Sequence, residues 1–235
     1  MWEYQKGSEH PLSIVINEAV KIFTDLGFEV ATGPELEDVW HNFDALNMPK
    51  DHPARDIQDT FWIKGHDDKV LRTHTSNVQI RYMENLTKSG GNPPFAIVVP
   101  GKIFRNEATD TTHGMQFYQL EALVIGKDIS LANFKFIVEV FLKRLLGPQI
   151  EFKFVPSYYP FVEPGLDVYM KWQDQWLEVA GAGMVHPKVL ENCGIDGEKW
   201  QGFAFGFGID RLTMIKFKIP DVRFFYQGDL RLNQF

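Results

Sequence analysis

Two neighbouring strand patterns in the middle of the chain place the tightest limit on how it folds. The first covers residues 95–105, the second covers residues 115–125, and a short polar loop joins them. Side chains two residues apart share a face of a strand, so Phe117, Gln119 and Glu121 lie on the same side of the second strand. A ring, an amide and a carboxylate on one sheet face form a floor for a flat, polar ligand.

A cation and a turn-forming loop complete this pattern. Arg105 ends the first strand with a planar, forked cation that suits a phosphate or a carboxylate. Residues 110–112 (Asp-Thr-Thr) and Gly114 have the chemistry of turns, so the loop can close over a ligand. The alternative interpretation is a hairpin that carries ordinary surface charges.

Composition limits the class of protein. At 235 residues the chain suits one large domain, and we expect a single domain over residues 1–235. Cys193 is the only cysteine, which excludes a disulfide framework and a zinc site built on cysteines. The formal net charge of −7 argues against broad, non-specific nucleic-acid binding, but not against a local basic patch. No apolar run is long enough to span a bilayer, so we expect a cytoplasmic location and no membrane partner.

The rest of the chain reads as helices and strands in mixed order. An apolar stripe predicts a helix over residues 12–26 that ends at Gly27 and leads into a strand at 28–30. Residues 40–62 are rich in aromatic residues and proline and predict an irregular, partly buried loop that ends in a strand at 60–63. Further along we expect a helix over 130–146, a strand over 150–155, and a hairpin of 167–172 with 176–179.

A predicted helix start offers a second place for a polar ligand. Ser76 is a plausible N-cap for a helix over residues 78–86, and a helix start provides free N–H groups and a positive dipole end. With His74 beside it and Gln79 one turn later, this end suits the carboxylate or amino group of a small substrate. The alternative is a capped surface helix.

Two aromatic residues in the second half of the chain suggest a pocket wall. Tyr159 and Phe161 are two residues apart, so in extended backbone they share a face and can contact an aromatic ligand edge to face. The small residues at 180–183 let a ligand approach the backbone closely. The alternatives are core rings and tight strand packing.

The last pattern is a glycine-rich strand that enters an apolar helix at residues 202–215. It lacks the Lys-Ser/Thr pair of a Walker loop, and its glycine spacing differs from the dinucleotide-binding fingerprint. Gly206 and Gly208 lie in the strand, and Asp210 and Arg211 lie where the helix begins.

Together these patterns resemble the three signature motifs of class II aminoacyl-tRNA synthetases, in the same order. The first motif matches the helix at 12–26 with its strand and Gly33-Pro34, the second matches residues 104–121, and the third matches 202–215, with Asp210 where the family usually has Glu. The resemblance implies an α+β class II synthetase catalytic fold, an antiparallel sheet flanked by helices. It covers residues 10–235, and the strings at 52–56, 72–76, 160–164 and 183–187 are specific to the alpha chains of phenylalanyl-tRNA synthetases.

The resemblance implies a nucleotide site. In this family the amino-acid carboxylate attacks the alpha-phosphate of ATP, which gives an aminoacyl adenylate and pyrophosphate, and catalysis is mainly positioning by cations. Arg105 would then bind the alpha-phosphate, His113 and Arg211 the outer phosphates, and Mg²⁺ would enter with ATP, with Glu163 as a candidate ligand. The adenine ring would contact Phe117, Glu107, Gly206 and Gly208.

The resemblance also implies an amino-acid site. Gln119 and Glu121 would bind the substrate ammonium, with His74, Ser76 and Gln79 nearby. The side-chain pocket would be lined by Tyr159, Phe161, Val162 and Ala204. The family usually has Phe where this chain has Tyr159, so phenylalanine is the expected substrate and tyrosine or another aromatic amino acid is the alternative.

The implied partners are phenylalanine, tRNA(Phe), a beta subunit of phenylalanyl-tRNA synthetase and a second copy bound through the first-motif helix. Family alpha chains carry an N-terminal coiled-coil arm before the first motif, and this sequence begins just before that motif. The sequence therefore leaves three alternatives: the synthetase catalytic chain, a free-standing paralogue that adenylates an aromatic amino acid without charging tRNA, and a non-catalytic binding relative. The intact Arg105, Glu107, His113 and Arg211 disfavour the third.

Overall fold

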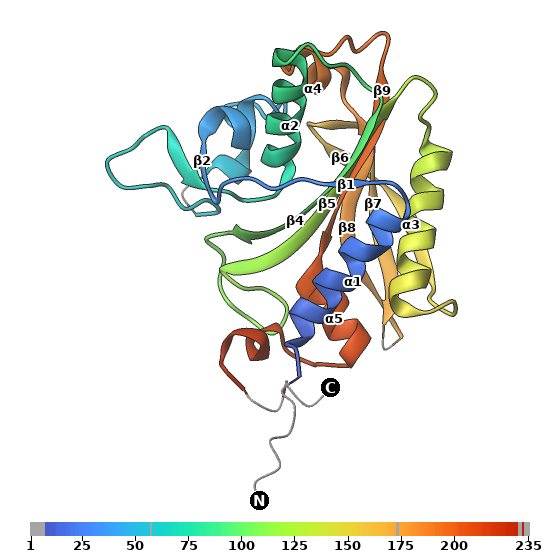
Figure 1. Cartoon of the computed structure of the whole chain (residues 1–235). Helices are drawn as coiled ribbons and strands as arrows, with labels where there is room; N and C mark the ends of the chain where they lie inside the picture. Colours follow the sequence, from blue (N-terminus) through green and yellow to red (C-terminus); the bar gives the residue numbers. More distant parts are fainter. Residues whose placement is uncertain (1–7, 57, 173, 230–231, 233–235) are drawn as a thin grey trace, which may run out of the picture.

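The fold is a seven-stranded sheet with helices on both faces (Figure 1). The structure, a computed structural model, describes residues 8–56, 58–172, 174–229 and 232. The strand order is β1-β4-β5-β9-β8-β7-β6, and every neighbouring pair is antiparallel except β1 with β4. The predicted α+β fold is confirmed, with one parallel pair at the sheet edge as the difference. The strands are β1 (Glu29–Val30), β4 (Phe95–Phe104), β5 (Gln116–Gly126), β6 (Phe152–Tyr159), β7 (Val162–Trp172), β8 (Gln175–Val185) and β9 (Gln201–Gly208).

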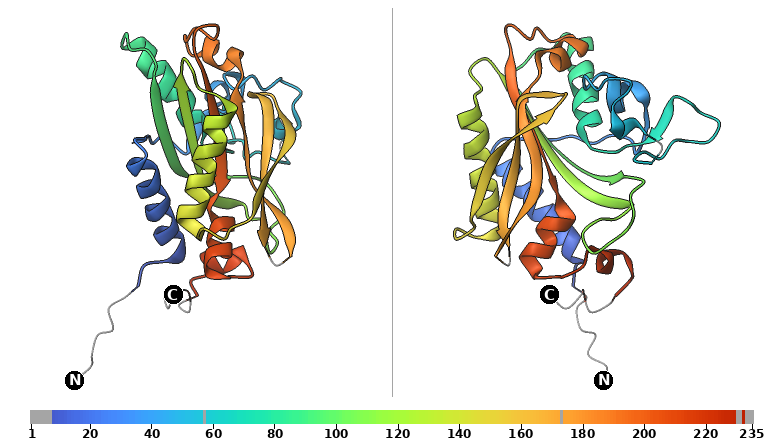
Figure 2. Two further views of the ribbon diagram at one scale, coloured as in Figure 1. Left: turned by 90° about the vertical axis from the view of Figure 1, so that its right-hand side faces the viewer. Right: turned by 180° about the vertical axis from the view of Figure 1, so that it is seen from behind.

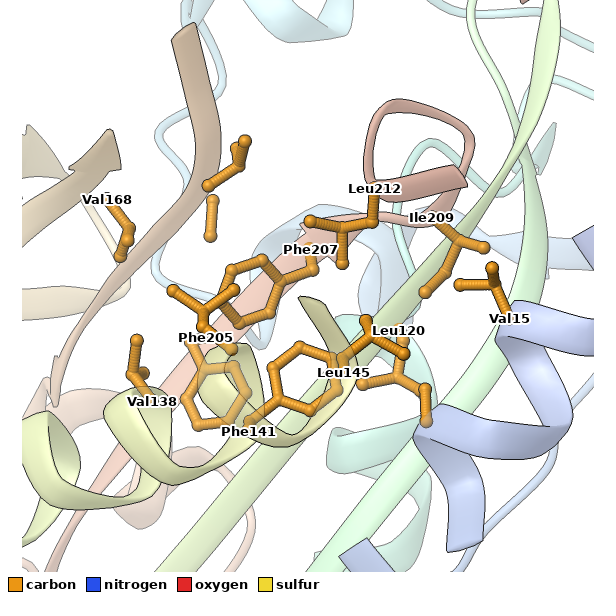
Figure 3. Packing of buried hydrophobic residues seen from close by; sticks show 14 of the residues in the cluster. Val15, Leu120, Val138, Phe141, Leu145, Val168, Phe205, Phe207, Ile209 and Leu212 are labelled. Atoms are coloured by element: carbon orange, nitrogen blue, oxygen red, sulfur yellow. The ribbon is translucent and has the colours of Figure 1, made fainter. Parts of the chain in front are cut away.

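Three helices cover one face of this sheet. Figure 3 shows Phe205 and Phe207 of β9 beside Phe141 of α3, in a cluster that α1 and α5 also enter. The ring centroids of Phe141 and Phe207 are 5.1 Å apart, and both side chains are fully buried. Burial of such rings is the main stabilising contribution to a core of this kind. These helices are α1 (Pro11–Asp25), α3 (Leu131–Leu146) and α5 (Ile209–Phe217).

The opposite face is covered only in part. Ile97, Leu123 and Val185 point to this side and pack with the helices α2 (Ser76–Lys88) and α4 (Pro187–Asn192) in a second apolar cluster. A segment with the short strands β2 (Leu36–Asp38) and β3 (Lys69–Leu71) projects beside them, as Figure 2 shows in its right-hand view. The rest of this face forms a cleft.

Several predicted elements are confirmed. The first helix and its stop at Gly27 are present, and Gly27 has the positive φ of +89° that favours glycine at a helix end. The central hairpin pairs β4 with β5 from Phe95↔Ile125 to Phe104↔Gln116. The helix predicted over 130–146 is α3, and Ser130 caps it by accepting a hydrogen bond from the Asn133 N–H.

Three predictions about local structure are wrong. Residues 60–63 form no strand and make only one isolated bridge, between Trp62 and Val70. Residues 40–62 instead include a π-helix, η1 (Trp40–Asp44), and a 3₁₀ turn, η2 (Pro53–Arg55). Ser76 is the first residue of α2 rather than its N-cap, and Thr75 in the cap position makes no capping bond through its side chain.

The third correction concerns Tyr159 and Phe161. They do not lie in one extended strand, because Pro160 and Phe161 form the tight turn between β6 and β7. Their rings nevertheless stack, with centroids 5.5 Å apart and planes at 25°. The turn brings together two rings that the period of two was expected to align.

Candidate active site

The uncovered part of the sheet face forms a cleft of about 1050 Å³. Its floor comes from β5, β9 and β8, and its walls come from α2, the β4–β5 loop and the β6–β7 turn. All of the residues predicted to bind ATP or the amino acid line this cleft: His74, Ser76, Gln79, Arg105, Glu107, His113, Phe117, Gln119, Glu121, Tyr159, Phe161, Val162, Ala204, Gly206, Gly208 and Arg211.

A cross-strand row of four residues shapes the floor. Glu121 of β5 pairs with Gly206 of β9, Gly206 with Gly181 of β8, and Gly181 with Asp167 of β7. A Cβ on Gly206 would lie 2.9 Å from the Glu121 Cγ, and a Cβ on Gly181 would lie 2.8 Å from the Tyr159 Oη. The two glycines therefore form a trough in the floor, between Glu121 and Asp167, that makes room for the Glu121 and Tyr159 side chains.

Two arginines lie at one end of the cleft. Arg105 follows β4 directly; its Nε donates to the Thr73 carbonyl at 3.2 Å, and its guanidinium lies 5.1 Å from the centre of the Phe117 ring. Arg211, in the first turn of α5, donates from Nη1 to the Glu178 carbonyl at 2.9 Å. Each guanidinium is anchored by a backbone carbonyl, and the Arg105 Nη1 also lies 3.7 Å from the Glu107 Oε1.

The β4–β5 loop orders a histidine beside Arg211. The Asp110 carboxylate accepts from the backbone N–H groups of Thr112 at 2.7 Å and His113 at 2.8 Å, a turn that also lowers the pKa of Asp110. The His113 Nδ1 lies 3.1 Å from the same carboxylate, and its Nε2 lies 3.3 Å from the Arg211 Nη2. Because Arg211 can only donate, this geometry assigns the ring hydrogen to Nδ1. The predicted turn chemistry of the loop is confirmed.

Hydrogen-bond acceptors gather in the middle of the cleft. The buried Glu121 carboxylate accepts from the Thr75 N–H at 3.1 Å and the Gln79 Nε2 at 2.8 Å, and burial raises its pKa to about 7. The His74 Nε2 donates to the Asn42 carbonyl at 2.9 Å, and burial lowers the pKa of His74 to about 4. His74 is therefore neutral, and its Nδ1 carries a lone pair.

Two of these acceptors are buried without a partner. Among the described residues, neither the His74 Nδ1 nor the Gln119 Oε1 has a hydrogen-bond partner. Buried polar atoms in folded proteins are nearly always paired, so such atoms beside a cleft need a donor from a ligand or from water. With the Glu121 carboxylate they offer three acceptors, which matches the three N–H donors of an ammonium group.

The far end of the cleft is apolar. Its walls are aliphatic and aromatic side chains that come from the loop after η1, α2, α4, the β6–β7 turn and the sheet. None of these side chains carries a hydrogen-bonding group that could face a ligand there. They are Leu46, Met83, Leu123, Phe161, Val162, Val185, Val189 and Ala204.

The hydroxyl of Tyr159 has its own partner. It donates to the Asp167 Oδ1 at 2.7 Å, and burial followed by this contact raises the pKa of Tyr159. The hydroxyl lies over Gly181, at the trough rather than at the apolar end. Tyr159 therefore presents its ring to the cleft, as a Phe would, while its polar atom is bound by the protein.

Some residues of the cleft were missed by the sequence analysis. A β-bulge between Val168 and Tyr169 shifts the register so that Tyr169 pairs with Glu178. The bulge leaves Val179 and Ala180 buried and directs Glu178 into the cleft. No local sequence signal marks this bulge, because it depends on how β7 and β8 pair.

Glu163 is not brought together with the other predicted residues. Its side chain is 79% exposed, lies 3.8 Å from the His186 Nε2, and is not part of the cleft wall.

A second group of acidic side chains lies outside the cleft. Glu37 and Asp38 both pair with Arg81, whose Nη2 lies 2.6 Å from the Glu37 Oε2. None of the helices in the described part of the chain has the length and apolar content that a bilayer crossing requires.

Comparison with known proteins defines the class to which this fold and cleft belong. The tRNA synthetases class II core domain (F) family matches residues 2–235, so the chain belongs to the class II aminoacyl-tRNA synthetase core-domain family. Within that class it is similar to proteins named phenylalanine–tRNA ligase alpha subunit. The identity is 46% over 242 residues with that of Flavobacterium psychrophilum and 49% over 247 residues with that of Dehalococcoides mccartyi; each match covers 97% of this chain and 70% of the relative. With the Clostridium perfringens protein of the same name the identity is 47%, over 97% of this chain and 69% of the relative.

Proposed function

We propose that this chain activates phenylalanine with ATP and transfers it to tRNA(Phe), as the alpha-type catalytic chain of a phenylalanyl-tRNA synthetase. The observation that carries the proposal is one continuous cleft with two arginines at one end, three ammonium-type acceptors in the middle and an apolar pocket at the other. These three parts match the phosphates, the amino group and the aromatic side chain of the two substrates. The names of the relatives support the same activity.

In the first half-reaction, a carboxylate oxygen of phenylalanine attacks the alpha-phosphorus of ATP. The new phosphorus–oxygen bond forms as the bond to the bridging oxygen breaks, and pyrophosphate leaves with the electron pair. Arg105 stabilises the charge that develops on the alpha-phosphate, and His113 and Arg211 hold the outer phosphates. Phe117 and Glu107 contact the adenine ring, with Gly206 and Gly208 leaving it room. No side-chain nucleophile is needed, because orientation in the cleft supplies most of the acceleration.

Recognition of the amino group follows from the three acceptors. The substrate ammonium donates to Glu121, Gln119 and His74, and its positive charge favours the ionised form of Glu121. Ser76 and Gln79 flank these acceptors on the first turn of α2. Binding therefore satisfies polar atoms that are otherwise buried and unpaired.

The apolar end selects phenylalanine over tyrosine. The phenyl ring contacts Tyr159, Phe161, Val162 and Ala204, and a para-hydroxyl there would lose its water without gaining a partner. An unpaired hydroxyl in an apolar pocket costs roughly 1–3 kcal/mol. The Tyr159–Asp167 bond keeps the chain's own hydroxyl away from this end.

We propose that Mg²⁺ enters with ATP and is held mainly by phosphate oxygens. Among the carboxylates that line the cleft, that of Glu178, which the bulge directs inward, lies beside the Arg211 side chain and could complete the oxygen coordination. Partial burial, followed by the charge of Asp167, raises the pKa of Glu178, and a bound cation would offset both. Glu163 is supported as a Mg²⁺ ligand by the sequence alone.

The proposed assembly contains tRNA(Phe), a beta subunit and a second copy bound through α1, in the cytoplasm. The word alpha in the relatives' names supports the beta subunit. The formal net charge of −7 is consistent with a chain that relies on a partner to grip tRNA. We further propose that residues 1–235 act as one catalytic domain.

ATP–pyrophosphate exchange tests the proposal directly. The chain is assayed with and without a beta subunit, and with phenylalanine and tyrosine in parallel, followed by charging of tRNA(Phe). We expect exchange with phenylalanine and charging in the presence of the beta subunit. Exchange without charging under either condition would instead identify a paralogue with another acceptor, and no exchange with either amino acid would contradict an adenylating activity.

A further inference from the structure

The last described segment of the chain forms part of the cleft, although no signature motif includes it. It contains the 3₁₀ helix η3 (Val222–Tyr226), and Val222, Arg223, Tyr226 and Gln227 line the cleft beside the β4–β5 loop. Val222 and Phe225 are buried and anchor the segment in the main core. Tyr226 is 39% exposed, so core packing alone does not account for its position.

Two hydrogen bonds join this segment to the nucleotide end of the cleft. The Val222 N–H donates to the Thr111 carbonyl of the β4–β5 loop at 3.0 Å. The Tyr226 hydroxyl donates to the Asp210 Oδ1 at 2.6 Å. The segment therefore contacts both structures that carry the proposed phosphate-binding residues, namely the loop of His113 and the helix start of Arg211.

Asp210 links three parts of the cleft. It is 3% exposed and lies in the first turn of α5, directly before Arg211. Its Oδ2 accepts from the Tyr118 N–H of β5 at 2.8 Å, while its Oδ1 accepts from Tyr226. The same carboxylate thus holds the strand of Phe117, the helix of Arg211 and the C-terminal segment in one arrangement.

The ionised form of Asp210 depends on these donors. Burial raises its pKa to about 6, and the hydrogen bonds from Tyr226 and Tyr118 oppose that increase. The titratable side chain that contacts it is Tyr226 of η3, whose own pKa the Tyr118 phenol of β5 helps to raise; Tyr118 contacts Asp210 through its backbone N–H, and Arg211 follows Asp210 on its own helix. Removing one donor would raise its pKa further and would leave one carboxylate oxygen free to turn.

We infer that Tyr226 is a positioning residue for ATP: its hydroxyl fixes the Asp210 carboxylate and thereby the placement of Arg211 against Phe117 across the nucleotide end of the cleft. Tyr226 acts through Asp210 and contacts no reacting atom. The inference rests on the proposed ATP-dependent activation and extends it to a residue outside the three motifs.

The test is Tyr226→Phe in the full chain, assembled with its beta subunit. This substitution keeps the ring and removes only the hydroxyl. We expect KM for ATP to rise about tenfold, the loss expected for one hydrogen bond to a charged group, while KM for phenylalanine stays unchanged. The acid limb of the pH profile of kcat/KM for ATP should move to higher pH, because Asp210 protonates more easily without its donor.

Two further variants serve as a control and as a test of the partner residue. Tyr82→Phe is the matched control, because the Tyr82 hydroxyl donates to the Glu29 Oε2 at 3.0 Å in a pair away from the cleft; its kinetics should equal those of the unmodified chain. Asp210→Asn should raise KM for ATP and remove the acid limb. Thermal melting of each variant checks the fold.

The outcomes separate this inference from the proposed function. Equal rises of both KM values in Tyr226→Phe, an unshifted acid limb, or kinetics like those of the control would overturn the role of Tyr226 while the activity stands. Absence of exchange in the unmodified chain overturns the proposed function, and the inference with it. ATP affinity measured by calorimetry on the unmodified chain and Tyr226→Phe confirms the inference only if the variant is weaker.

Discussion

The two faces of strand β9 carry different kinds of residue. Phe203, Phe205 and Phe207 are buried in the helix-side cluster, where Figure 3 shows Phe205 and Phe207. Ala204, Gly206 and Gly208 alternate with them along the strand and line the cleft. The helix-side face carries large aromatic rings, and the cleft-side face carries only small residues. A single strand with a period of two thus supplies stability on one side and room for a ligand on the other.

The difference also explains how a cleft can exist in a small domain. The aromatic cluster of β9 with α1, α3 and α5 lies directly beneath the trough of Gly206 and Gly181. Large rings on the helix side stabilise the central strands, so the part of the opposite face that α2 and α4 leave uncovered can stay open. If the two faces are separate, a change on one face should leave the properties of the other unaltered.

Arg105→Ala should have the largest effect, and only on the cleft side. Loss of the cation that we propose binds the alpha-phosphate should lower kcat/KM for pyrophosphate exchange by about 10³-fold. Thermal stability should change little, because the Arg105 side chain is partly exposed and its contacts are one backbone hydrogen bond, a 3.7 Å ion pair with Glu107 and the Phe117 ring. Near-normal exchange in this variant would refute the assigned role.

Phe205→Ala should affect the other face. Removing a fully buried ring from the helix-side cluster should lower the free energy of unfolding by about 3–5 kcal/mol. Chemical denaturation measures this loss. If the folded variant also shows a KM for phenylalanine far from that of the original chain, the two faces are coupled more tightly than we state.

Gly206→Ala should change substrate binding on the cleft side, in contrast to the loss of stability expected for Phe205→Ala. The added Cβ would lie 2.6 Å from the Gln119 Nε2 and 2.9 Å from the Glu121 Cγ, so these side chains must shift. We expect KM for phenylalanine to rise roughly tenfold to a hundredfold, because the ammonium loses well-placed acceptors. A Cβ on Gly208 meets no protein atom within 4 Å, so the added methyl group would occupy space that we propose for the adenine ring. Gly208→Ala should therefore change KM for ATP rather than KM for phenylalanine.

The pH dependence of phenylalanine binding should reflect Glu121. Its pKa is about 7 in the free protein, and only the ionised carboxylate pairs with an ammonium group. Therefore kcat/KM for phenylalanine should rise as pH increases toward 7 and fall about tenfold per unit well below it. Glu121→Gln should have low activity without this acid limb; an unchanged acid limb would assign it to another group.

Tyr159→Phe should have the smallest effect. The hydroxyl contacts Asp167 and not the apolar end, so kcat/KM for phenylalanine should change less than about threefold, and the free energy of unfolding should fall by about 1 kcal/mol. Preference for phenylalanine over tyrosine should persist. A large gain in tyrosine activation would show that this hydroxyl sets specificity.

Much of the fold was predictable because its strongest signals are local. The stripe of α1, the paired strands of the central hairpin and the alternation of Phe117, Gln119 and Glu121 follow from the periods of helices and strands. The irregular segment over residues 40–62 was harder. Its π-helix and 3₁₀ turn are stabilised by tertiary contacts, such as that of Asn42 with Thr73, rather than by a periodic pattern.

By itself the sequence determined that Phe117, Gln119 and Glu121 share one strand face, because side chains alternate along a strand, and the resemblance to the class II family pointed to the other motif residues of the cleft. Only the tertiary structure decided how they meet. Pairing across strands placed Glu121, Gly206, Gly181 and Asp167 in one row, and a bulge turned Glu178 inward. Contacts of this kind join residues far apart in the chain, and their register depends on the whole packed sheet rather than on any local stretch.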